Sequence, residues 1–278
     1  MYNPPKIRNF ANNCFINCAL QIFLNLPKSD VYSLCQLGFN DQCKITREML
    51  DLLVAQYNDS SSSSSNHQNI LNISKLYQLL IDNKVVKLNQ QGDYHEVLLF
   101  ILDRLQSQGK LNVEQYFTGK FKKTIICQNC EHRSSHREVF STVTLSNLGI
   151  IQSIIDLATV VTIDSYDCEK CKRQGSVQSL TKIEKMPKIL MLHSPVKLKD
   201  RQSLHHKYDI NIDGYNHLYY LYLTVHHTGN YNGGHYYCQL YRNGHYYRIN
   251  DDNIKVSTTP DTQNIISVFL ISGGHHPP

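Results

Sequence analysis

The chain has 278 residues, of which 41% are hydrophobic and 18% are charged, and its formal net charge at pH 7 is +5. This length allows one large domain or two small ones with a real hydrophobic core, and the composition is that of a globular protein. No apolar run approaches the ~18 to 20 residues of a membrane span, and the positive charge is too small and too dispersed to indicate nucleic-acid binding.

Helical patterns occupy roughly the first 110 residues. Apolar residues recur at helical spacing over 14–26, where Asn12 or Asn13 can serve as the N-cap and Pro27 ends the helix. Further helices are predicted at 44–57, 74–82 and 93–106, and the serine run at 60–65 is predicted to be a loop.

After Gly109 the chain becomes rich in β-branched and aromatic residues. These predict strands at 120–127, 139–145, 189–193, 219–225 and 236–241, followed by a disordered tail at 275–278. Because helices come first and strands second, the expected class is α+β and not alternating α/β.

The cysteines and the N-terminus indicate a reducing compartment. The nine cysteines stand at 14, 18, 35, 43, 127, 130, 168, 171 and 238. Their number is odd, and the first residues, MYNPPKIRN, lack the apolar core of a secretory signal. Both observations disfavour a disulfide framework and favour thiols used for metal binding or catalysis. We therefore expect an intracellular protein, in the cytoplasm, the nucleus or both.

Two C-x-x-C pairs predict a metal site. Cys127 and Cys130 form the first pair, and Cys168 and Cys171 form the second. Two such pairs can complete a tetrahedral thiolate site for Zn²⁺ that has no open position, so its role would be structural. The long interval between the pairs requires a hairpin or a longer excursion that brings them together. The alternative is four unmetallated core thiols.

Cys14 is a candidate nucleophile. It stands at the predicted start of the first helix, where the helix dipole and free backbone N–H groups favour a thiolate. Most lone cysteines are inert core residues, and a core role is the expectation for Cys18, one turn further on. Cys14 needs a base elsewhere in the chain before it can be treated as a nucleophile.

A hairpin near the C-terminal end supplies a candidate base. Asn243-Gly244 predicts a type I′ turn in which residue 242 faces residue 245. In that register His235 faces Asp252, Asn250 is its diagonal neighbour on the same face, and Asp251 points to the opposite face. The register therefore nominates Asn250 or Asp252 to orient the imidazole and disfavours Asp251 unless a bulge intervenes. An imidazole oriented in this way could accept the proton of Cys14.

Several blocks of the chain together resemble the ubiquitin-specific proteases. They are Asn9 to Gln21 (cysteine box), Gln90 to Glu96 (glutamine–aspartate box), the two C-x-x-C pairs with Pro187 to Leu190, and His227 to Tyr236 with Ile249 to Asp252 (histidine box). The blocks follow the family order and span almost the whole chain, and no single one is specific. The resemblance implies a papain-like thumb–palm–fingers fold with a zinc-ribbon-like fingers element.

The resemblance also implies a domain organisation and catalytic roles. The chain would be one catalytic domain over 1–278, with a helical thumb at about 1–110, palm and fingers at about 111–275, and zinc-bearing fingers around 120–185. Cys14 would be the nucleophile, His235 the general base and Asn250 the third member. Asn9 would stabilise the oxyanion together with the backbone N–H of Cys14. Asp251 would be a second polar residue that aids catalysis.

The implied activity is hydrolysis of the isopeptide or peptide bond after the C-terminal Gly-Gly of ubiquitin. Ubiquitin or ubiquitinated proteins would be the partners, and Asp93 would pair with the basic ubiquitin tail, although its carboxylate could instead cap a helix. The other implied substrate-binding residues are Gln91, Glu96, Gly233, Gly234 and His227, and the last of these could equally be a core histidine. We expect structural Zn²⁺, no organic cofactor, no nucleic-acid or membrane partner, and a monomer.

Some positions depart from the family pattern. Ala11 and Asn13 replace the usual glycine and threonine, Cys18 replaces serine, and Gly92 stands inside the glutamine–aspartate box. The first alternative function is therefore a weak or inactive pseudoenzyme that binds ubiquitin or a ubiquitin-like modifier. A zinc-ribbon nucleic-acid binder is the second, and it would need a basic face that the composition does not indicate.

Overall fold

A computed structural model describes residues 2–35, 43–59, 70–108, 112–195, 203–212, 214–230 and 233–273. The serine run at 60–65 and the tail at 275–278 lie outside the described residues. The chain forms two compact units. The first unit contains Met1–Val113 and Tyr222–Ile266, and the second contains Glu114–Leu221 and Ser267–His275.

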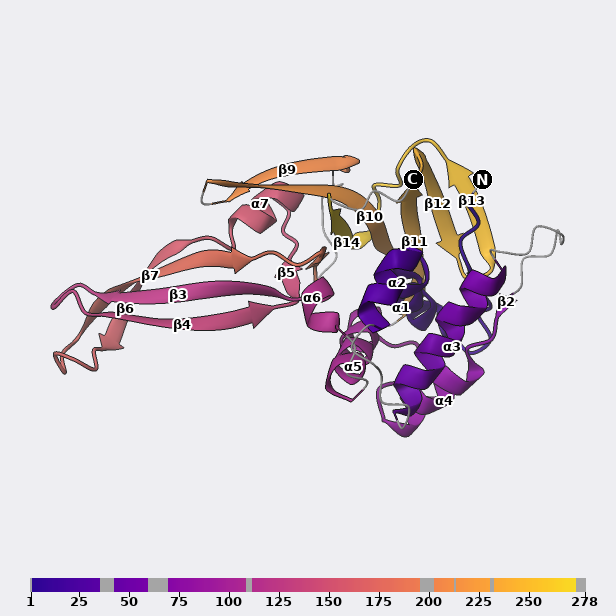
Figure 1. The fold of residues 1–278 in the computed structure, drawn as a ribbon, viewed down its shortest axis with the longest axis horizontal. Helices are drawn as coiled ribbons and strands as arrows, with labels where there is room; N and C mark the ends of the chain where they lie inside the picture. The colour runs from indigo at the N-terminus through magenta and orange to yellow at the C-terminus, as the bar shows by residue number, and fades with distance from the viewer. Residues whose placement is uncertain are drawn as a thin grey trace. The chain divides into compact units, whose positions relative to one another are not determined.

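Five helices belong to the first unit. They are α1 (Cys14–Leu24), α2 (Lys28–Cys35), α3 (Lys44–Asp59), α4 (Ser74–Asp82) and α5 (Tyr94–Ser107) (Figure 1). The predicted helix at 74–82 is confirmed at both ends, and the other three are confirmed within two residues at each end. Helix α2 was not predicted, because Pro27 was treated only as a helix terminator. It also begins α2, since its carbonyl accepts the N–H groups of Asp30 and Val31.

Helix α1 is the centre of the first unit. All eleven of its residues are buried. One of its faces packs against strand β11 (Gly233–Arg242), where the Phe15 ring lies 6.5 Å from the Tyr236 ring. The hydroxyl of Tyr222 donates to the carbonyl of Ile22 on the same helix at 2.7 Å. A helix buried on every side has few conformational alternatives, so its first residue, Cys14, is held firmly.

The hairpin predicted from Asn243-Gly244 is present. Strand β11 pairs antiparallel with β12 (His245–Asn250), and Arg242 faces His245 as predicted. Asn243 and Gly244 have φ of 52° and 76°, the left-handed values that a type I′ turn requires. Strand β12 pairs in turn with β13 (Asn253–Ser257), and β11 pairs with the last part of β10 (Tyr215–Asn230). A short parallel pair, β1 (Lys6–Ile7) with β2 (Ile70–Leu71), precedes these strands in the chain.

The second unit contains a four-stranded sheet in the order β4-β3-β7-β6. Its strands are β3 (Gly119–Cys127), β4 (Arg133–Phe140), β6 (Val160–Asp167) and β7 (Gln174–Lys185), which run side by side in Figure 1. The other elements of this unit are most of α6 (Val113–Phe117), β5 (Thr142–Thr144), α7 (Ile150–Ile155), β8 (Ile189–His193), β9 (Lys207–Ile212), residues 215–221 of β10, and most of β14 (Ile265–Ser272).

The strand predicted at 139–145 is wrong. The chain instead ends β4 at Phe140 and begins a separate strand, β5, at Thr142. Strand β4 pairs antiparallel with β3, whereas β5 pairs parallel with β8, so the break at Ser141 lets the chain change sheets. An apolar β-branched run does not reveal such a change, because both halves have the same local preference. The mixed helix and strand content agrees with the predicted α+β class.

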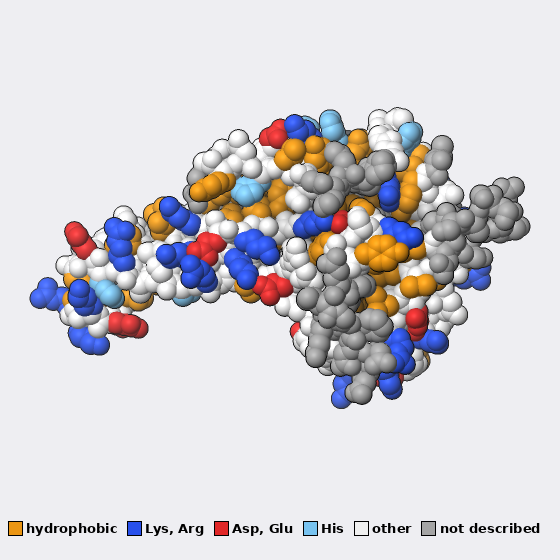
Figure 2. All heavy atoms as spheres, in the orientation of Figure 1, with side chains coloured by type: hydrophobic (Ala, Val, Ile, Leu, Met, Phe, Trp, Pro, Cys, Tyr) orange, Lys and Arg blue, Asp and Glu red, His pale blue; other side chains and the backbone are white. Residues whose placement is uncertain are grey.

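Basic side chains gather over β3 and β4 in Figure 2, with acidic side chains among them. Lys120 pairs with Glu114, and Arg137 pairs with Glu184, each at 2.7 Å. These carboxylates neutralise part of the local positive charge.

Among the helices of the described residues, none is both long enough and apolar enough to cross a membrane.

Candidate active site and metal centre

The turn before Cys14 is organised by asparagines. Asn12 has φ of 56°, in the left-handed region that asparagine tolerates better than most residues. The fully buried side chain of Asn13 accepts hydrogen bonds from the N–H groups of Phe10 (2.8 Å) and Ala11 (3.1 Å) through Oδ1. Its Nδ2 donates to the carbonyl of Arg8 at 3.1 Å.

Asn13 holds the N-cap position of α1, but its side chain makes no capping bond to that helix. The expected side-chain cap is therefore absent, because Oδ1 is already bonded to the residues before Cys14. Asparagine at this position closes the turn that delivers Cys14 to the start of the helix. The first N–H groups of a helix have no intrahelical partner, so the N–H of Cys14 lies where a bound anion could use it.

His235 links Cys14 to Asn250. Its Nε2 bonds to Oδ1 of Asn250, and the thiol of Cys14 is its second side-chain partner. Because an amide oxygen only accepts, Nε2 carries a proton and Nδ1 is left for the thiol. The bond with Cys14 raises the pKa of His235 to about 9, against the opposing effect of burial, and the bond with Asn250 adds to the rise. The geometry favours an imidazolium paired with a thiolate.

This pairing predicts how His235 titrates. In the folded protein its pKa should be about 9, and Cys14→Ala should move it toward the ordinary value of about 6.5, because the alanine removes the largest cause of the rise. A raised pKa stabilises the fold fully below about pH 6.5, and that contribution is lost as the pH rises through about 9. Imidazole NMR titration tests the first statement. The difference in Tm between wild type and Cys14→Ala, followed from pH 6 to 10, tests the second.

A His235 resonance that titrates near 6.5 in both proteins would contradict the ion pair. Cys43→Ala is the matched control, because this buried thiol contacts Gln108 and not the imidazole. It should leave the titration of His235 unchanged.

Asp251 lies beside His235, which corrects the expectation from the hairpin register. Its Oδ2 is 3.9 Å from Nε2 of His235. The register placed Asp251 on the opposite face, but β12 ends at Asn250, and Asp251 has φ of 57° in a tight turn to β13. Alternation of side chains stops where the strand stops. Asp252, which the register allowed as an orienter, lies 3.9 Å from Arg8 and not against the imidazole.

Asn9 is held from both ends. Its Oδ1 accepts the N–H of Asn13 at 3.1 Å, and its side chain also hydrogen-bonds to Asp251. With Oδ1 occupied, the amide group presents Nδ2 as its donor, and one of the two N–H bonds remains after Asp251 is satisfied. Asn9 therefore has the donor that an oxyanion needs, in a fixed orientation.

Gln91 and Gly234 contact each other. The backbone N–H of Gly234 donates to Oε1 of Gln91 at 2.9 Å. Nε2 of Gln91 is buried and has no partner among the described residues. A Cβ at Gly234 would stand 2.1 Å from the carbonyl of Thr228 and 2.5 Å from Nε2 of His227, so no other residue fits there. Gly233 is exposed, and a Cβ at that position would meet nothing.

Asp93 caps α5. Its Oδ1 accepts from the N–H groups of His95 (2.6 Å) and Glu96 (3.3 Å). The structure thus contains the helix cap that the sequence left as an alternative, and contact with a basic substrate tail stays a prediction. Asp93 and Glu96 are both exposed, so the start of α5 presents two carboxylates. Gly92 is needed because a Cβ there would stand 2.8 Å from the Phe15 ring.

His227 is half-buried, and Cys18 is buried. The ring of His227 is 4.4 Å from that of Tyr236, which places it against the aromatic residues around Phe15.

Burial raises the pKa of Cys18 well above its ordinary range, and a hydrogen bond with the thiol of Cys238 adds to the rise. A thiol that stays protonated does not compete with Cys14 as a nucleophile.

Two residues were missed by the sequence reasoning, Asn13 and Asn17. Nδ2 of Asn17 donates to Oδ1 of Asp251 at 2.7 Å, and Oδ1 of Asn17 accepts from Nδ2 of Asn13 at 2.8 Å. The available signal for Asn17 was its place as a polar residue inside the apolar run of 14–26, since a buried polar side chain requires internal partners.

The four predicted metal ligands lie together in the second unit. The Sγ atoms of Cys127, Cys130, Cys168 and Cys171 all lie within 4.8 Å of one another. The Cys130 and Cys168 sulfurs are 3.7 Å apart. A tetrahedral ion with Zn–S bonds of ~2.3 Å holds its sulfurs about 3.8 Å apart, so this arrangement fits zinc.

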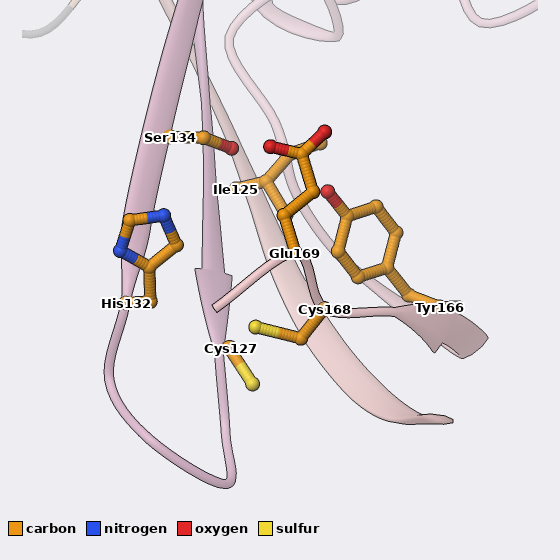
Figure 3. Close-up of a pocket in the computed structure, with 7 residues that line it drawn as sticks. All are labelled: Ile125, Cys127, His132, Ser134, Tyr166, Cys168 and Glu169. Atoms are coloured by element: carbon orange, nitrogen blue, oxygen red, sulfur yellow. The ribbon is translucent and has the colours of Figure 1, made fainter. Parts of the chain in front are cut away.

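Both C-x-x-C pairs adopt the same backbone knuckle. The carbonyl of Cys127 accepts the N–H of Glu131, and that of Cys168 accepts the N–H of Lys172, each at 2.9 Å. Glu131 and Lys172 both have φ of 56°. Figure 3 shows the side chains of Cys127 and Cys168 side by side, with Glu169 and Tyr166 nearby.

The pKa values of two of the four thiols are shifted in opposite directions. Hydrogen bonds from the backbone of Cys171 and then Lys170 lower the pKa of Cys168 to about 6. The pKa of Cys130 is raised to about 11: the backbone bond with His132 lowers it, but burial and the bonds with the other three thiols outweigh that effect. Four clustered thiols resist joint ionisation unless a cation balances the charge.

Comparison with known proteins finds consistent relatives. The family model described as ubiquitin carboxyl-terminal hydrolase matches residues 5–271. Ubiquitin carboxyl-terminal hydrolase 17-like protein D of Mus musculus is 23% identical over 205 residues, which are 67% of this chain and 36% of that protein. Ubiquitin carboxyl-terminal hydrolase 24 of Mus musculus is 30% identical over 125 residues, 40% of this chain and 5% of that protein.

A solved structure shares the fold. It is a chain of the SAGA DUB module Ubp8/Sgf11/Sus1/Sgf73 bound to monoubiquitin, with a TM-score of 0.76 and 17% identity. The match covers 96% of this chain and 69% of that one. The chain spans about a third of the length of the first curated relatives that it matches.

Proposed function

Because the chain belongs to the ubiquitin carboxyl-terminal hydrolase family, we propose that it is a cysteine deubiquitinase that hydrolyses the isopeptide or peptide bond after the C-terminal Gly-Gly of ubiquitin. The observation that carries the proposal is the hydrogen-bonded series of Cys14, His235 and Asn250 at the N-terminus of a buried helix. All three lie in the first unit of the chain.

The first half of the reaction uses the ion pair. The thiolate of Cys14 attacks the carbonyl carbon of the last glycine, and Nδ2 of Asn9 and the N–H of Cys14 donate hydrogen bonds to the oxyanion that forms. The imidazolium of His235 then protonates the leaving lysine amine. Asn250 keeps Nδ1 of the imidazole directed at the sulfur throughout, because it bonds to Nε2.

The second half removes the thioester. Once the amine has left, His235 is neutral and can accept a proton from water, which attacks the thioester carbonyl through a second oxyanion at the same donors. Breakdown of this oxyanion cleaves the C–S bond, releases ubiquitin with a free C-terminal carboxyl group, and returns the thiolate of Cys14 beside the imidazolium, which keeps the proton taken from water. His235 gives one proton to the leaving amine and takes one from water, so the reaction requires no further acid or base.

Substrate contacts are proposed for the start of α5 and its surroundings. The carboxylates of Asp93 and Glu96 suit the arginines of a ubiquitin tail. The buried Nε2 of Gln91 is a donor for a backbone carbonyl of that tail. Gly234 keeps side-chain bulk away from His227 and from the backbone of β10.

Zinc is proposed for the four-cysteine centre. When bound, the ion would cross-link the two knuckles and take no part in the reaction, because all four of its positions would be filled by cysteine. We further propose that the protein acts inside the cell as a monomer, without an organic cofactor and without a nucleic-acid or membrane partner.

The test is capture by ubiquitin that carries a C-terminal electrophile. The wild-type chain should gain the mass of one ubiquitin, and tryptic mapping should place the adduct on Cys14. The His235→Ala variant should react far more slowly. If the folded, zinc-loaded protein binds ubiquitin but forms no adduct, the chain is a ubiquitin-binding pseudoenzyme and the proposed activity is wrong.

A further inference from the structure

The carboxylate of Asp251 lies between the candidate oxyanion donor and the imidazole. It hydrogen-bonds to the side chain of Asn9, and its Oδ2 is 3.9 Å from Nε2 of His235. That distance is too long for a hydrogen bond, yet a modest rotation of the side chain would close it. Because the Asp251 side chain is only 11% exposed, it cannot simply turn toward water.

Asn17 holds this carboxylate away from the imidazole. Its Nδ2 donates to Oδ1 of Asp251 at 2.7 Å, the shorter of the two bonds that this donor makes, since the carbonyl of Ile7 is 3.4 Å away. Asn17 is only 3% exposed. The bond therefore lies out of bulk water, where an amide–carboxylate bond is strong.

Asn13 fixes the orientation of the Asn17 amide. Oδ1 of Asn13 accepts two backbone N–H groups, so its Nδ2 must face Asn17. Oδ1 of Asn17 accepts that Nδ2 at 2.8 Å, which turns Nδ2 of Asn17 toward Oδ1 of Asp251 and the carbonyl of Ile7. A flipped Asn17 amide would leave two donors facing each other.

The partner of His235 matters for the chemistry. A carboxylate at Nε2 stabilises the imidazolium more than an amide does, so an Asp251 partner would make His235 a weaker acid toward the leaving amine. Burial raises the pKa of Asp251, the bonds from Asn17 and then Asn9 lower it, and the charge of His235 lowers it further. Both amides therefore help to keep the carboxylate charged without a hydrogen bond to the imidazole. The charged or titratable neighbours are Cys14 and Asp251 at His235, and His235, Asp252 and Cys18 at Asp251.

We propose that Asn17 is a positioning residue that makes Asn250, and not Asp251, the side chain bonded to the imidazole of His235. Asn17 touches neither substrate nor the reacting atoms. It acts by holding Oδ1 of Asp251, with its own amide fixed by Asn13. The proposal rests on the proposed function only where activity is measured, since the choice of partner at His235 is a property of the free protein.

The first test is imidazole NMR titration of the full chain. Asn17→Ala should release Asp251 toward Nε2 and raise the pKa of His235 above about 9. Adding Asp251→Asn should reverse the rise. Asn25→Ala is the matched control, because Asn25 is a buried asparagine next to the same helix that bonds to Gln21 and Tyr2 and not to the site. It should lower Tm and leave the titration of His235 unchanged.

The second test is a double-mutant cycle in kcat/KM. Asn250→Ala should cost roughly 10- to 100-fold in the wild-type background, but less than about threefold in the Asn17→Ala background, because Asp251 already occupies Nε2 there. If Asn17→Ala does not fold, Asn17→Ser serves instead, since its side chain is one atom too short to hold Asp251. The proposal would be overturned if Asn17→Ala left the titration of His235 unchanged. It would also be overturned if the loss of kcat/KM in the double variant equalled the product of the two single losses.

The two failures can be told apart. If no ubiquitin adduct forms but the titration of His235 shifts as expected, the proposed function is wrong and the role of Asn17 stands. If the adduct forms and the titration does not respond to Asn17→Ala, the activity stands and Asn17 is only a structural residue.

Discussion

Cys14→Ala is expected to lower kcat/KM for a ubiquitin C-terminal amide by ~10⁴-fold or more. The alanine removes the atom that forms the covalent intermediate, and only the oxyanion donors and substrate binding remain. His235→Ala should cost about as much, because the imidazole is the group that takes the proton of Cys14 in the proposed reaction. Steady-state hydrolysis of a fluorogenic ubiquitin amide provides the measurement.

The double variant Cys14→Ala/His235→Ala should be no worse than either single variant, since the two residues act as one unit. Asn9→Ala should lose roughly 10²- to 10³-fold in kcat with little change in KM, the pattern of a donor that acts only on the oxyanion. Cys18→Ser is the matched control: it changes a buried thiol on the same helix and should stay within about threefold of wild type. Hydrolysis by Cys14→Ala within tenfold of wild type would remove Cys14 from the mechanism.

Cys127→Ser is expected to abolish zinc binding and to destabilise the four-stranded sheet of the second unit. The buried cluster at that end of the sheet consists of Cys127, Cys168 and Val177, with only a few partly buried residues packed against it. So small a core does not hold two knuckles together without the ion. A loss of about 5 kcal/mol corresponds to a fall in Tm of roughly 10 to 20 °C for a chain of this size.

Metal analysis should find about one zinc per wild-type chain and none in the variant. Hydrogen exchange should show that protection is lost in β3, β4, β6 and β7 before it is lost in the first unit, because the knuckles join the ends of these strands. Cys238→Ser is the control, since this buried thiol lies in the first unit and its loss should leave the zinc content unchanged. A wild-type protein without zinc, with Cys127→Ser equally stable, would contradict the metal centre.

Local patterns predicted a large part of the fold. The helix at 74–82 and the strand at 189–193 were predicted with the bounds observed, because each has a strong period of its own and clear ends. The Asn243-Gly244 turn set the pairing of β11 with β12. The cluster of four cysteines was also predicted correctly, because the spacing within each C-x-x-C pair defines a knuckle that does not depend on the rest of the chain.

The sequence identified candidate residues for the site but not the contacts among them. The predicted hairpin register placed Asn250 near His235, which the structure confirms. The same register placed Asp251 on the opposite face, which is wrong because β12 ends before that residue. Asn13 looked like a helix cap and Asn17 like one polar residue in an apolar helix. Which bonds a buried amide makes depends on groups that are distant in sequence, such as Asp251 for Asn17.

The sequence by itself indicated the class of fold, because helical patterns precede strand patterns, and the four clustered cysteines, because each C-x-x-C spacing defines a knuckle. It nominated Cys14 and His235 as candidate nucleophile and base only through the order of several blocks along the chain. Only the tertiary structure decided which side chains hold the imidazole and the oxyanion donor in place. Asn9, Asn13, Asn17 and Asp251 share hydrogen bonds because α1, the turn before it and the turn after β12 meet. The physical reason is that a buried polar group must find its partner in space, and the order of residues along the chain does not specify that partner.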